Sequence, residues 1–170
     1  MDKSMLRKWA KEVRSKLDID ALSEKLVQKL KQTEEYKQAT NIMIFYPLKD
    51  EVNLLSLLDD STKSFYLPKI NGDNLLCCKY NKDTPLCESC FHTKEPDGVI
   101  AINKDLIDLI VVPALAVDKK NYRLGYGGGF YDKLLKGTKH KTIVCIPEKL
   151  IVDTIYPDGF DIPVDKVITA

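Results

Sequence analysis

Apolar side chains near the start of the chain recur at intervals of three and four residues. That spacing matches the period of an α-helix with one buried face. Charged residues such as Lys8 and Lys11 occupy positions between them. The pattern therefore predicts two successive helices, the first burying Leu6, Trp9, Ala10, Val13 and Leu17, and the second capped by Asp20 and burying Leu22, Leu26, Val27 and Leu30.

Farther along, short runs of branched and aromatic residues replace the helical spacing. The run at 106–113, Leu-Ile-Asp-Leu-Ile-Val-Val-Pro, is typical of a strand buried on both faces. Strands that alternate with helices predict one α/β domain over residues 1–170, with an open, mostly parallel sheet flanked by helices. We expect strands at 41–46, 64–67, 109–112, 142–146 and 164–168, helices at 52–58 and 130–136, and a strand with a loop excursion within 75–97.

Ligands of such sheets bind at the carboxyl ends of the strands. Three segments follow predicted strands, namely residues 47–51, residues 115–132 and the chain from 147 onward. We therefore expect these segments to gather along one edge of the sheet.

The middle segment contains the most informative feature of the chain. Residues 123–132 read Arg-Leu-Gly-Tyr-Gly-Gly-Gly-Phe-Tyr-Asp. Glycines let the backbone approach a ligand closely, and successive N–H groups form a concavity suited to phosphate. Arg123 at one end is a fixed cation for phosphate, and Asp132 at the other is a hard oxygen ligand for Mg²⁺. The run predicts a nucleotide triphosphate site, against the alternative of a mobile surface turn.

Two familiar phosphate loops do not match this run. A P-loop ends in Gly-Lys-Ser/Thr, and no Lys or hydroxyl residue follows Gly129 directly. The dinucleotide fingerprint requires glycine where Phe130 stands.

Near the start of the chain, Lys3 and Arg7 are four residues apart, so they share a helix face. On spacing alone, a solvated basic face that includes Arg14 is the favoured interpretation of that pair.

Charge and hydropathy narrow the class of protein. Basic and acidic residues number 26 and 25, giving a formal net charge of +1, and no basic stripe indicates nucleic acid. No apolar run reaches the roughly 20 residues of a membrane span, and the first residues lack the apolar segment of a signal peptide. We expect a cytoplasmic protein that acts on small molecules without a membrane partner, as a monomer or, alternatively, a dimer.

Five cysteines, an odd number, argue against a disulfide framework. Cys87 and Cys90 with His92 and the Cys77-Cys78 pair could supply four zinc ligands. Adjacent cysteines point in divergent directions, and a second Cys-x-x-Cys is missing. Buried or loop thiols are therefore favoured over a metal site.

The ten-residue run resembles the signature of the 5-formyltetrahydrofolate cyclo-ligases, the methenyltetrahydrofolate synthetases, with Phe130 in place of the family's first Tyr. Four further segments resemble the family in the same order. They are Lys3-Ser4-Met5-Leu6-Arg7, Tyr46-Pro47 with Glu51-Val52, residues 111–118 (Val-Val-Pro-Ala-Leu-Ala-Val-Asp) and residues 161–165 (Asp-Ile-Pro-Val-Asp).

The resemblance implies a fold similar to that of sugar-phosphate isomerases and CoA transferases, and a ligase that uses ATP and Mg²⁺. It implies cyclisation of 5-formyltetrahydrofolate to 5,10-methenyltetrahydrofolate with release of ADP and phosphate. Arg123, Lys3 and Arg7 would be catalytic, by neutralising phosphate charge. The implied ATP site comprises Lys3, Ser4, Met5, Leu6, Arg7, Arg123, Leu124, Gly125, Tyr126, Gly127, Gly128, Gly129, Phe130 and Tyr131.

The resemblance also implies a metal site and a folate site. Asp132 and Asp161 would hold Mg²⁺, with Asp165 as the alternative to Asp161. Tyr46 and Glu51 would bind the reduced pterin, although sequence alone favours an exposed loop acid at Glu51. Two segments depart from the family: residues 98–102 stand where we expect its Gly-Ile-x-Glu-Pro, and Phe160 replaces its usual His.

Three other functions stay open at this point. The same ATP site could serve a kinase or ligase acting on another formyl or carboxylate compound. A nucleotide- or folate-binding regulator without turnover is the second alternative, against which Arg123 and Asp132 count. A zinc-dependent interaction module is the third.

Overall fold

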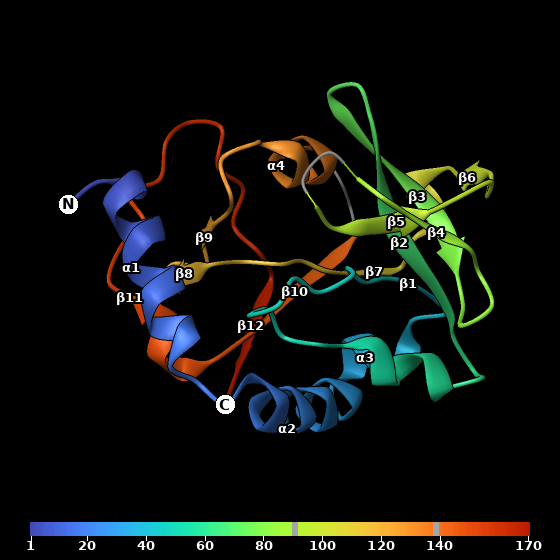
Figure 1. Ribbon diagram of the computed structural model, residues 1–170, viewed down its shortest axis with the longest axis horizontal. Coiled ribbons are helices and arrows are strands. Elements are labelled where there is room, and N and C mark those ends of the chain that lie inside the picture. The colour runs from blue at the N-terminus through green and yellow to red at the C-terminus, as the bar shows by residue number, and fades with distance from the viewer. Residues whose placement is uncertain (90–91, 138–139) are drawn as a thin grey trace.

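The structure is a computed structural model that describes residues 1–89, 92–137 and 140–170 (Figure 1). Its helices are α1 (Lys3–Ser15), α2 (Ile19–Lys31), α3 (Glu34–Gln38) and α4 (Phe130–Leu135), with 3₁₀ turns η1 (Leu55–Asp59), η2 (Lys104–Leu106) and η3 (Glu148–Leu150). Its strands are β1 (Asn41–Met43), β2 (Ser64–Asn71), β3 (Asn74–Tyr80), β4 (Leu86–Glu88), β5 (Lys94–Pro96), β6 (Ala101–Ile102), β7 (Leu109–Val111), β8 (Ala116–Asp118), β9 (Arg123–Leu124), β10 (Lys141–Ile146), β11 (Ile151–Val152) and β12 (Lys166–Thr169).

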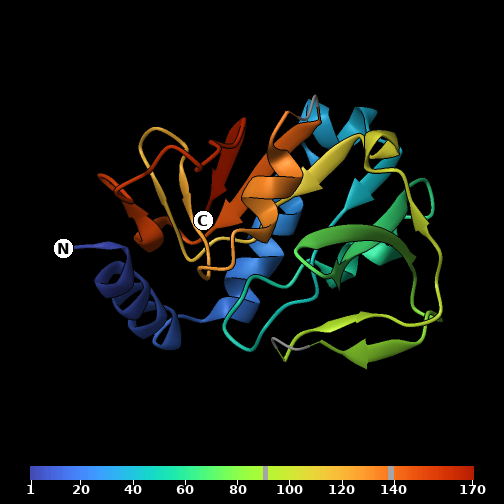
Figure 2. The same cartoon turned by 90° about the horizontal axis from the view of Figure 1, so that it is seen from above.

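A seven-stranded sheet in the order β12-β10-β7-β1-β2-β3-β6 forms the centre of the described chain. The strands from β12 to β2 pair in parallel, whereas β3 and β6 join in antiparallel pairings. A smaller sheet, β11-β8-β9, and the β4-β5 hairpin lie outside it, as the view in Figure 2 shows. The predicted α/β class with a mostly parallel sheet is therefore confirmed.

Alternate residues of the central strands face opposite layers. In β1 and the residue after it, Ile42 and Ile44 belong to the core beneath α2 and α3, whereas Met43 faces the core beneath α1 and α4. The other central strands alternate in the same way, because successive side chains of a strand point to opposite faces. Helices thus cover both faces of the sheet (Figure 1), and each face has its own apolar cluster.

Several predicted boundaries were wrong. The second helix is capped by Asp18, whose carboxylate accepts a hydrogen bond from the Ala21 amide at 3.1 Å, and not by Asp20. The first strand ends at Met43 rather than at 46, and the helix expected at 52–58 is the 3₁₀ turn η1. The sequence pattern did not indicate α3 or the small β11-β8-β9 sheet. Among the described residues, no helix has the length and apolar character needed to cross a membrane.

The alternating core leads to a stability prediction. Leu26 of α2 is 0% exposed against the sheet, so Leu26→Ala should lower the free energy of unfolding by about 2–5 kcal/mol, through lost burial and a residual cavity. Leu106 is 57% exposed, and the control Leu106→Ala should change the free energy of unfolding by no more than about 0.5 kcal/mol. Urea denaturation followed by circular dichroism measures both; equal losses would contradict this packing.

Candidate active site

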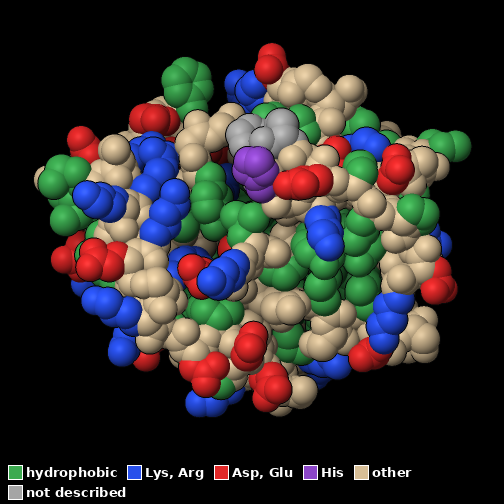
Figure 3. Space-filling model, viewed as in Figure 1, with side chains coloured by type: hydrophobic (Ala, Val, Ile, Leu, Met, Phe, Trp, Pro, Cys, Tyr) green, Lys and Arg blue, Asp and Glu red, His purple; other side chains and the backbone are tan. Residues whose placement is uncertain are grey.

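A cavity of about 890 Å³ opens where loops from several elements meet. Residues after β1, the β9–α4 loop and residues 158–162 all line it, together with two basic residues of α1. The prediction that three segments gather along one edge of the sheet is thus confirmed. Figure 3 views this face and shows Lys and Arg side chains gathered over α1. The ends of β2 and β5, which add Pro68, Ile70 and Glu95 to the lining, were not foreseen.

Arg123 supplies the most deeply buried cation of the described cavity lining. It lies on β9, is 6% exposed, and donates a hydrogen bond from Nη1 to the Pro113 carbonyl at 3.1 Å. Its Nη2 lies 3.9 Å from Asp132 Oδ1, and its guanidinium lies 5.3 Å from the centre of the Tyr131 ring. Burial lowers the pKa of Arg123, and the Asp132 charge opposes that shift. These contacts fix a guanidinium beside the glycine loop.

The glycine loop is shaped by the cations that it contacts. A Cβ atom on Gly125 would lie 2.8 Å from Arg123 Nη1, and one on Gly127 would lie 3.7 Å from the Arg7 guanidinium carbon. Gly127 also has φ of +103°, a conformation that L side chains rarely adopt. Arg7 Nε donates to the Gly125 carbonyl at 2.9 Å. Arg7 therefore lines the cavity and contacts the glycine loop, so the interpretation of this residue as part of a solvated face was wrong.

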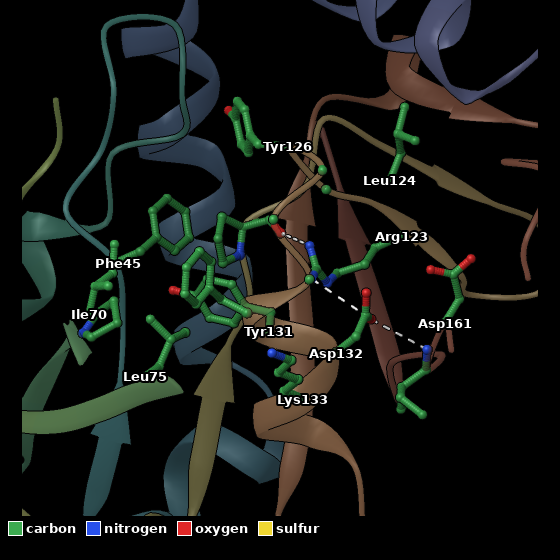
Figure 4. Close-up of a pocket in the computed structure, with 18 of the residues that line it drawn as sticks. Phe45, Ile70, Leu75, Arg123, Leu124, Tyr126, Tyr131, Asp132, Lys133 and Asp161 are labelled. Atoms are coloured by element: carbon green, nitrogen blue, oxygen red, sulfur yellow. Dashed lines mark hydrogen bonds and ion pairs between the residues drawn. The ribbon is translucent and has the colours of Figure 1, made fainter. Parts of the chain in front are cut away.

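Two carboxylates, Asp132 and Asp161, lie at the same side of the cavity (Figure 4). Burial raises the pKa of Asp132, Arg123 opposes the shift, and the charge of Asp161 adds to it. Lys3 Nζ lies 2.6 Å from Asp161 and 3.1 Å from Asp158. Burial acts to lower the pKa of Lys3, but these two hydrogen bonds raise it overall.

This donor set fits a magnesium ion that also binds phosphate. Mg²⁺ commonly takes one or two protein carboxylates and completes its shell with water and substrate phosphates. Asp132 and Asp161 supply two hard oxygen donors, and no group of three or more potential metal-ligating side chains occurs within the described ranges. The pair therefore suits a metal that arrives with a polyanion better than a closed protein site.

The opposite side of the cavity is apolar and aromatic. Figure 4 shows Phe45, Ile70 and Leu75 there, with Tyr131 between them and Arg123. Tyr46 also lines the cavity, with its carbonyl accepting from Thr93 Oγ1 at 3.2 Å. Of the aromatic residues in the run, Tyr131 packs on the core and Tyr126 is 44% exposed. Such a surface suits a flat heterocycle.

Glu51 is a buried carboxylate at the apolar side. It is 7% exposed and accepts a hydrogen bond from the Leu48 amide at 2.8 Å. Burial raises the pKa of Glu51, whereas the Leu48 hydrogen bond and the nearby Arg14 charge oppose the shift. The exposed loop acid favoured by sequence alone was therefore wrong, because the chain folds back over this residue.

Arg14 is a buried residue that the helical pattern assigned to solvent. It is 3% exposed, and its guanidinium donates to the carbonyls of Asp50 (3.1 Å), Leu115 (3.3 Å) and Ala114. It thus ties α1 to the loops after β1 and β7, which border the cavity. The only sequence signal was its position four residues after Ala10, on the buried face.

Several other expected residues lie away from the described lining. Met5 is 58% exposed, Leu6 packs in the core, and Ser4 lies on the helix surface, so their backbone and side chains do not join Lys3 and Arg7 at the cavity. Asp165 accepts hydrogen bonds from Thr142 instead of lining the cavity. Asp161 is therefore the better placed of the two alternatives.

The wall expected at residues 98–102 was also misplaced. None of these residues lines the cavity, and Ile100 is 89% exposed. Glu95 lines it from β5 and is followed by Pro96, so a Glu-Pro pair does stand at this wall. Glu95 Oε2 accepts a hydrogen bond from the Ile70 amide at 3.1 Å.

The cysteines divide between core and hairpin. Cys77 and Cys78 are buried on adjacent positions of β3, with Cys77 Sγ 3.7 Å from Met43 Sδ and Cys78 Sγ 4.0 Å from the Val99 carbonyl. Cys87 lies on β4, and its Sγ is 3.7 Å from the Glu95 carbonyl. Cys90, which belongs with His92 to the alternative set of zinc ligands, lies outside the described residues, whereas His92 is described.

Known proteins are similar to this chain in sequence and in fold. The 5-formyltetrahydrofolate cyclo-ligase of Haemophilus influenzae is 29% identical over 147 residues, which cover 79% of this chain and 78% of that protein. The enzyme of the same name from Mycoplasma pneumoniae is 28% identical over 173 residues, 99% of this chain and 98% of that protein. The solved structure of Aquifex aeolicus 5,10-methenyltetrahydrofolate synthetase superposes with a TM-score of 0.87 at 33% identity, covering 99% of this chain and 90% of that one.

The family model agrees with these pairwise similarities. It is described as the 5-formyltetrahydrofolate cyclo-ligase family, and it matches residues 2–170. The match includes the glycine run with Arg123 and Asp132, and the segment of α1 that places Lys3 and Arg7 at the cavity. The chain is therefore an enzyme, a ligase, and belongs to the 5-formyltetrahydrofolate cyclo-ligase family.

Proposed function

We propose that residues 1–170 form one domain that uses ATP and Mg²⁺ to cyclise 5-formyltetrahydrofolate to 5,10-methenyltetrahydrofolate, releasing ADP and phosphate. The observation that carries the proposal is the division of one cavity into two chemically different sides. Lys3, Arg7 and Arg123 surround a glycine loop at one side, while aromatic residues and the buried Glu51 form the other. A cytoplasmic location and a monomeric state stay predictions from the sequence.

The cationic side suits a triphosphate. Arg123 offers a guanidinium fixed by the Pro113 carbonyl, and Arg7 is fixed by the Gly125 carbonyl. Fixed cations stabilise charge that develops during phosphoryl transfer, since little reorganisation is needed at the moment of reaction. Mg²⁺ held by Asp132 and Asp161 would neutralise phosphate charge when bound. The exposed Phe160, also in the lining, borders this side.

The aromatic side suits a reduced pterin. Tyr131 and Phe45 provide ring faces, and Glu51 can accept hydrogen bonds from the amino and ring N–H groups of the heterocycle. Because Glu51 is buried, those hydrogen bonds would form away from competing water. A pterin held in this way would leave its formyl group to reach toward the phosphate side.

The chemistry needs positioning more than a nucleophilic side chain. The formyl oxygen attacks the γ-phosphorus, the bond to the β-phosphate oxygen breaks, and ADP leaves. The activated formyl carbon is then attacked by N10 of the folate. Its C–O bond breaks with phosphate as the leaving group, and N10 gives up its proton. Holding the formyl group, N10 and the γ-phosphate in one cavity would supply much of the rate.

Asp132→Asn tests the phosphate side while keeping the size of the side chain. We expect wild type to form methenyl product, followed by its near-ultraviolet absorbance, and the variant to lose on the order of 100-fold or more in kcat/KM. Asp153→Asn is the control, because Asp153 is an exposed carboxylate outside this cavity. Equal rates for Asp132→Asn and wild type would remove Asp132 from the site.

Glu51→Gln tests the pterin side. Removing the charged acceptor should raise KM for the folate roughly 10- to 100-fold and leave KM for ATP near its wild-type value. Because burial raises the pKa of Glu51, wild type should lose folate affinity as the pH falls, starting above the ordinary range of a glutamate. The variant should show a flat profile over that range. A profile shared by both proteins would assign the titration to another group.

Gly125→Ala tests the packing of Arg123 without touching its charge. The added Cβ would lie 2.8 Å from Arg123 Nη1 and should displace the guanidinium, lowering kcat/KM roughly 10- to 100-fold. Gly159→Ala is the matched control, since a Cβ there meets nothing within 4 Å although Gly159 also lines the cavity. Thermal melts of both variants confirm folding. Equal activity would show that Arg123 needs no such clearance.

A further inference from the structure

Lys3 forms an ion pair with Asp161, one of the two carboxylates of the proposed metal site. Its Nζ lies 2.6 Å from Asp161 Oδ2, and both side chains are largely buried at 22% and 12% exposure. The same Oδ2 accepts a hydrogen bond from the Asp158 amide at 2.8 Å. An ammonium group and a divalent cation cannot both sit against this oxygen. In the ligand-free chain, Oδ2 of Asp161 is therefore committed to Lys3, and the ammonium charge beside it opposes a cation at the other oxygen of the same carboxylate.

Asp158 offers Lys3 a second partner on the solvent side. Its Oδ2 lies 3.1 Å from Lys3 Nζ, and its side chain is 59% exposed. Its other oxygen, Oδ1, accepts from the Phe160 amide at 2.8 Å, which orients the carboxylate. If Lys3 leaves Asp161, it stays paired through Asp158 and keeps its position at the rim of the cavity. The ammonium can then meet a phosphate with little cost in unpaired charge.

We infer that Asp158 is a positioning residue, which holds Lys3 while its ammonium moves from Asp161 to the nucleotide phosphate and so frees Asp161 for the metal. The inference rests on the proposed ATP and Mg²⁺ sites. It makes metal binding stronger with nucleotide, because a phosphate together with Asp158 gives Lys3 the partners that replace Asp161. Asp132, whose Oδ1 accepts from the Ile162 amide at 3.4 Å, is the metal partner next to this exchange.

Metal binding itself tests the exchange, with Mn²⁺ as a probe for Mg²⁺ and free Mn²⁺ measured by paramagnetic resonance. Without nucleotide, wild type should bind Mn²⁺ weakly, and Lys3→Gln should bind it roughly fivefold to tenfold more tightly because Asp161 is released. With a non-hydrolysable ATP analogue, Asp158→Asn should bind Mn²⁺ several-fold more weakly than wild type, since Lys3 then stays on Asp161. Asp158→Glu should restore most of that affinity.

A double-mutant cycle separates this role from a general loss of negative charge. In a Lys3→Gln background, Asp158→Asn should have no further effect on Mn²⁺ affinity with the analogue, because Asp158 acts through Lys3. Asp153→Asn is the charge-matched control, an exposed carboxylate paired at 2.6 Å with Lys119 and outside the cavity. Additive effects of the two substitutions, or no gain in Mn²⁺ binding for Lys3→Gln, would overturn the inference.

The controls also separate this inference from the proposed function. Calorimetry of wild type with the ATP analogue and Mg²⁺ reports whether the nucleotide site exists at all. No binding there would remove the proposed function and this inference with it. Binding and turnover in wild type, together with additive substitutions, would remove the exchange alone.

Discussion

Close approach between guanidinium groups and the glycine backbone organises this site. Arg123 Nη1 lies 2.8 Å from the point where a Cβ of residue 125 would stand, and Arg7 donates to the carbonyl of the same residue. The glycines thus make room for the protein's own cations as well as for a ligand. Without that clearance, β9 could not bring Arg123 under the loop beside Asp132. The packing of Arg123 and Arg7 against the glycine loop therefore sets both the position of the loop and the charge beside it.

A second buried guanidinium, that of Arg14, holds the same region from behind. Burying this charge is costly unless its donors find acceptors, and carbonyls from the loops after β1 and β7 accept from Nη1 and Nη2, whereas Nε has no hydrogen-bond partner among the described residues. One of those loops carries Glu51, and the other leads through Pro113, whose carbonyl holds Arg123. The aromatic side and the phosphate side of the cavity thus share one anchor in α1, which also carries Lys3 and Arg7. Movement of α1 would disturb both sides together.

The sequence predicted features that depend on local pattern and missed those that depend on distant contacts. Helical spacing found α1 and α2, and apolar runs found the parallel strands, since both patterns record burial directly. Asp18 and Asp20 are both acceptable caps, so pattern alone could not choose between them. Arg14 was assigned to solvent because its hydrogen-bond partners lie 36 or more residues away in the sequence. Glu51 was assigned to solvent because its partner Leu48 lies in a loop whose path no pattern predicts. The residues of the glycine run were found because their order is distinctive, but their pairings were not.

Pairing between cations and carboxylates in the cavity explains why the composition of the chain did not indicate the proposed nucleotide site. The cations Lys3 and Arg123 each face a carboxylate within the cavity, so the ligand-free site does not form a basic patch. Such internal pairing keeps buried charges from going unsatisfied before a ligand arrives. The proposed nucleotide and its metal would bring both signs of charge, so they could replace each internal pair with a pair of their own. A site with such internal pairs adds little net charge to a chain with 26 basic and 25 acidic residues, so the composition does not reveal the proposed polyanion site.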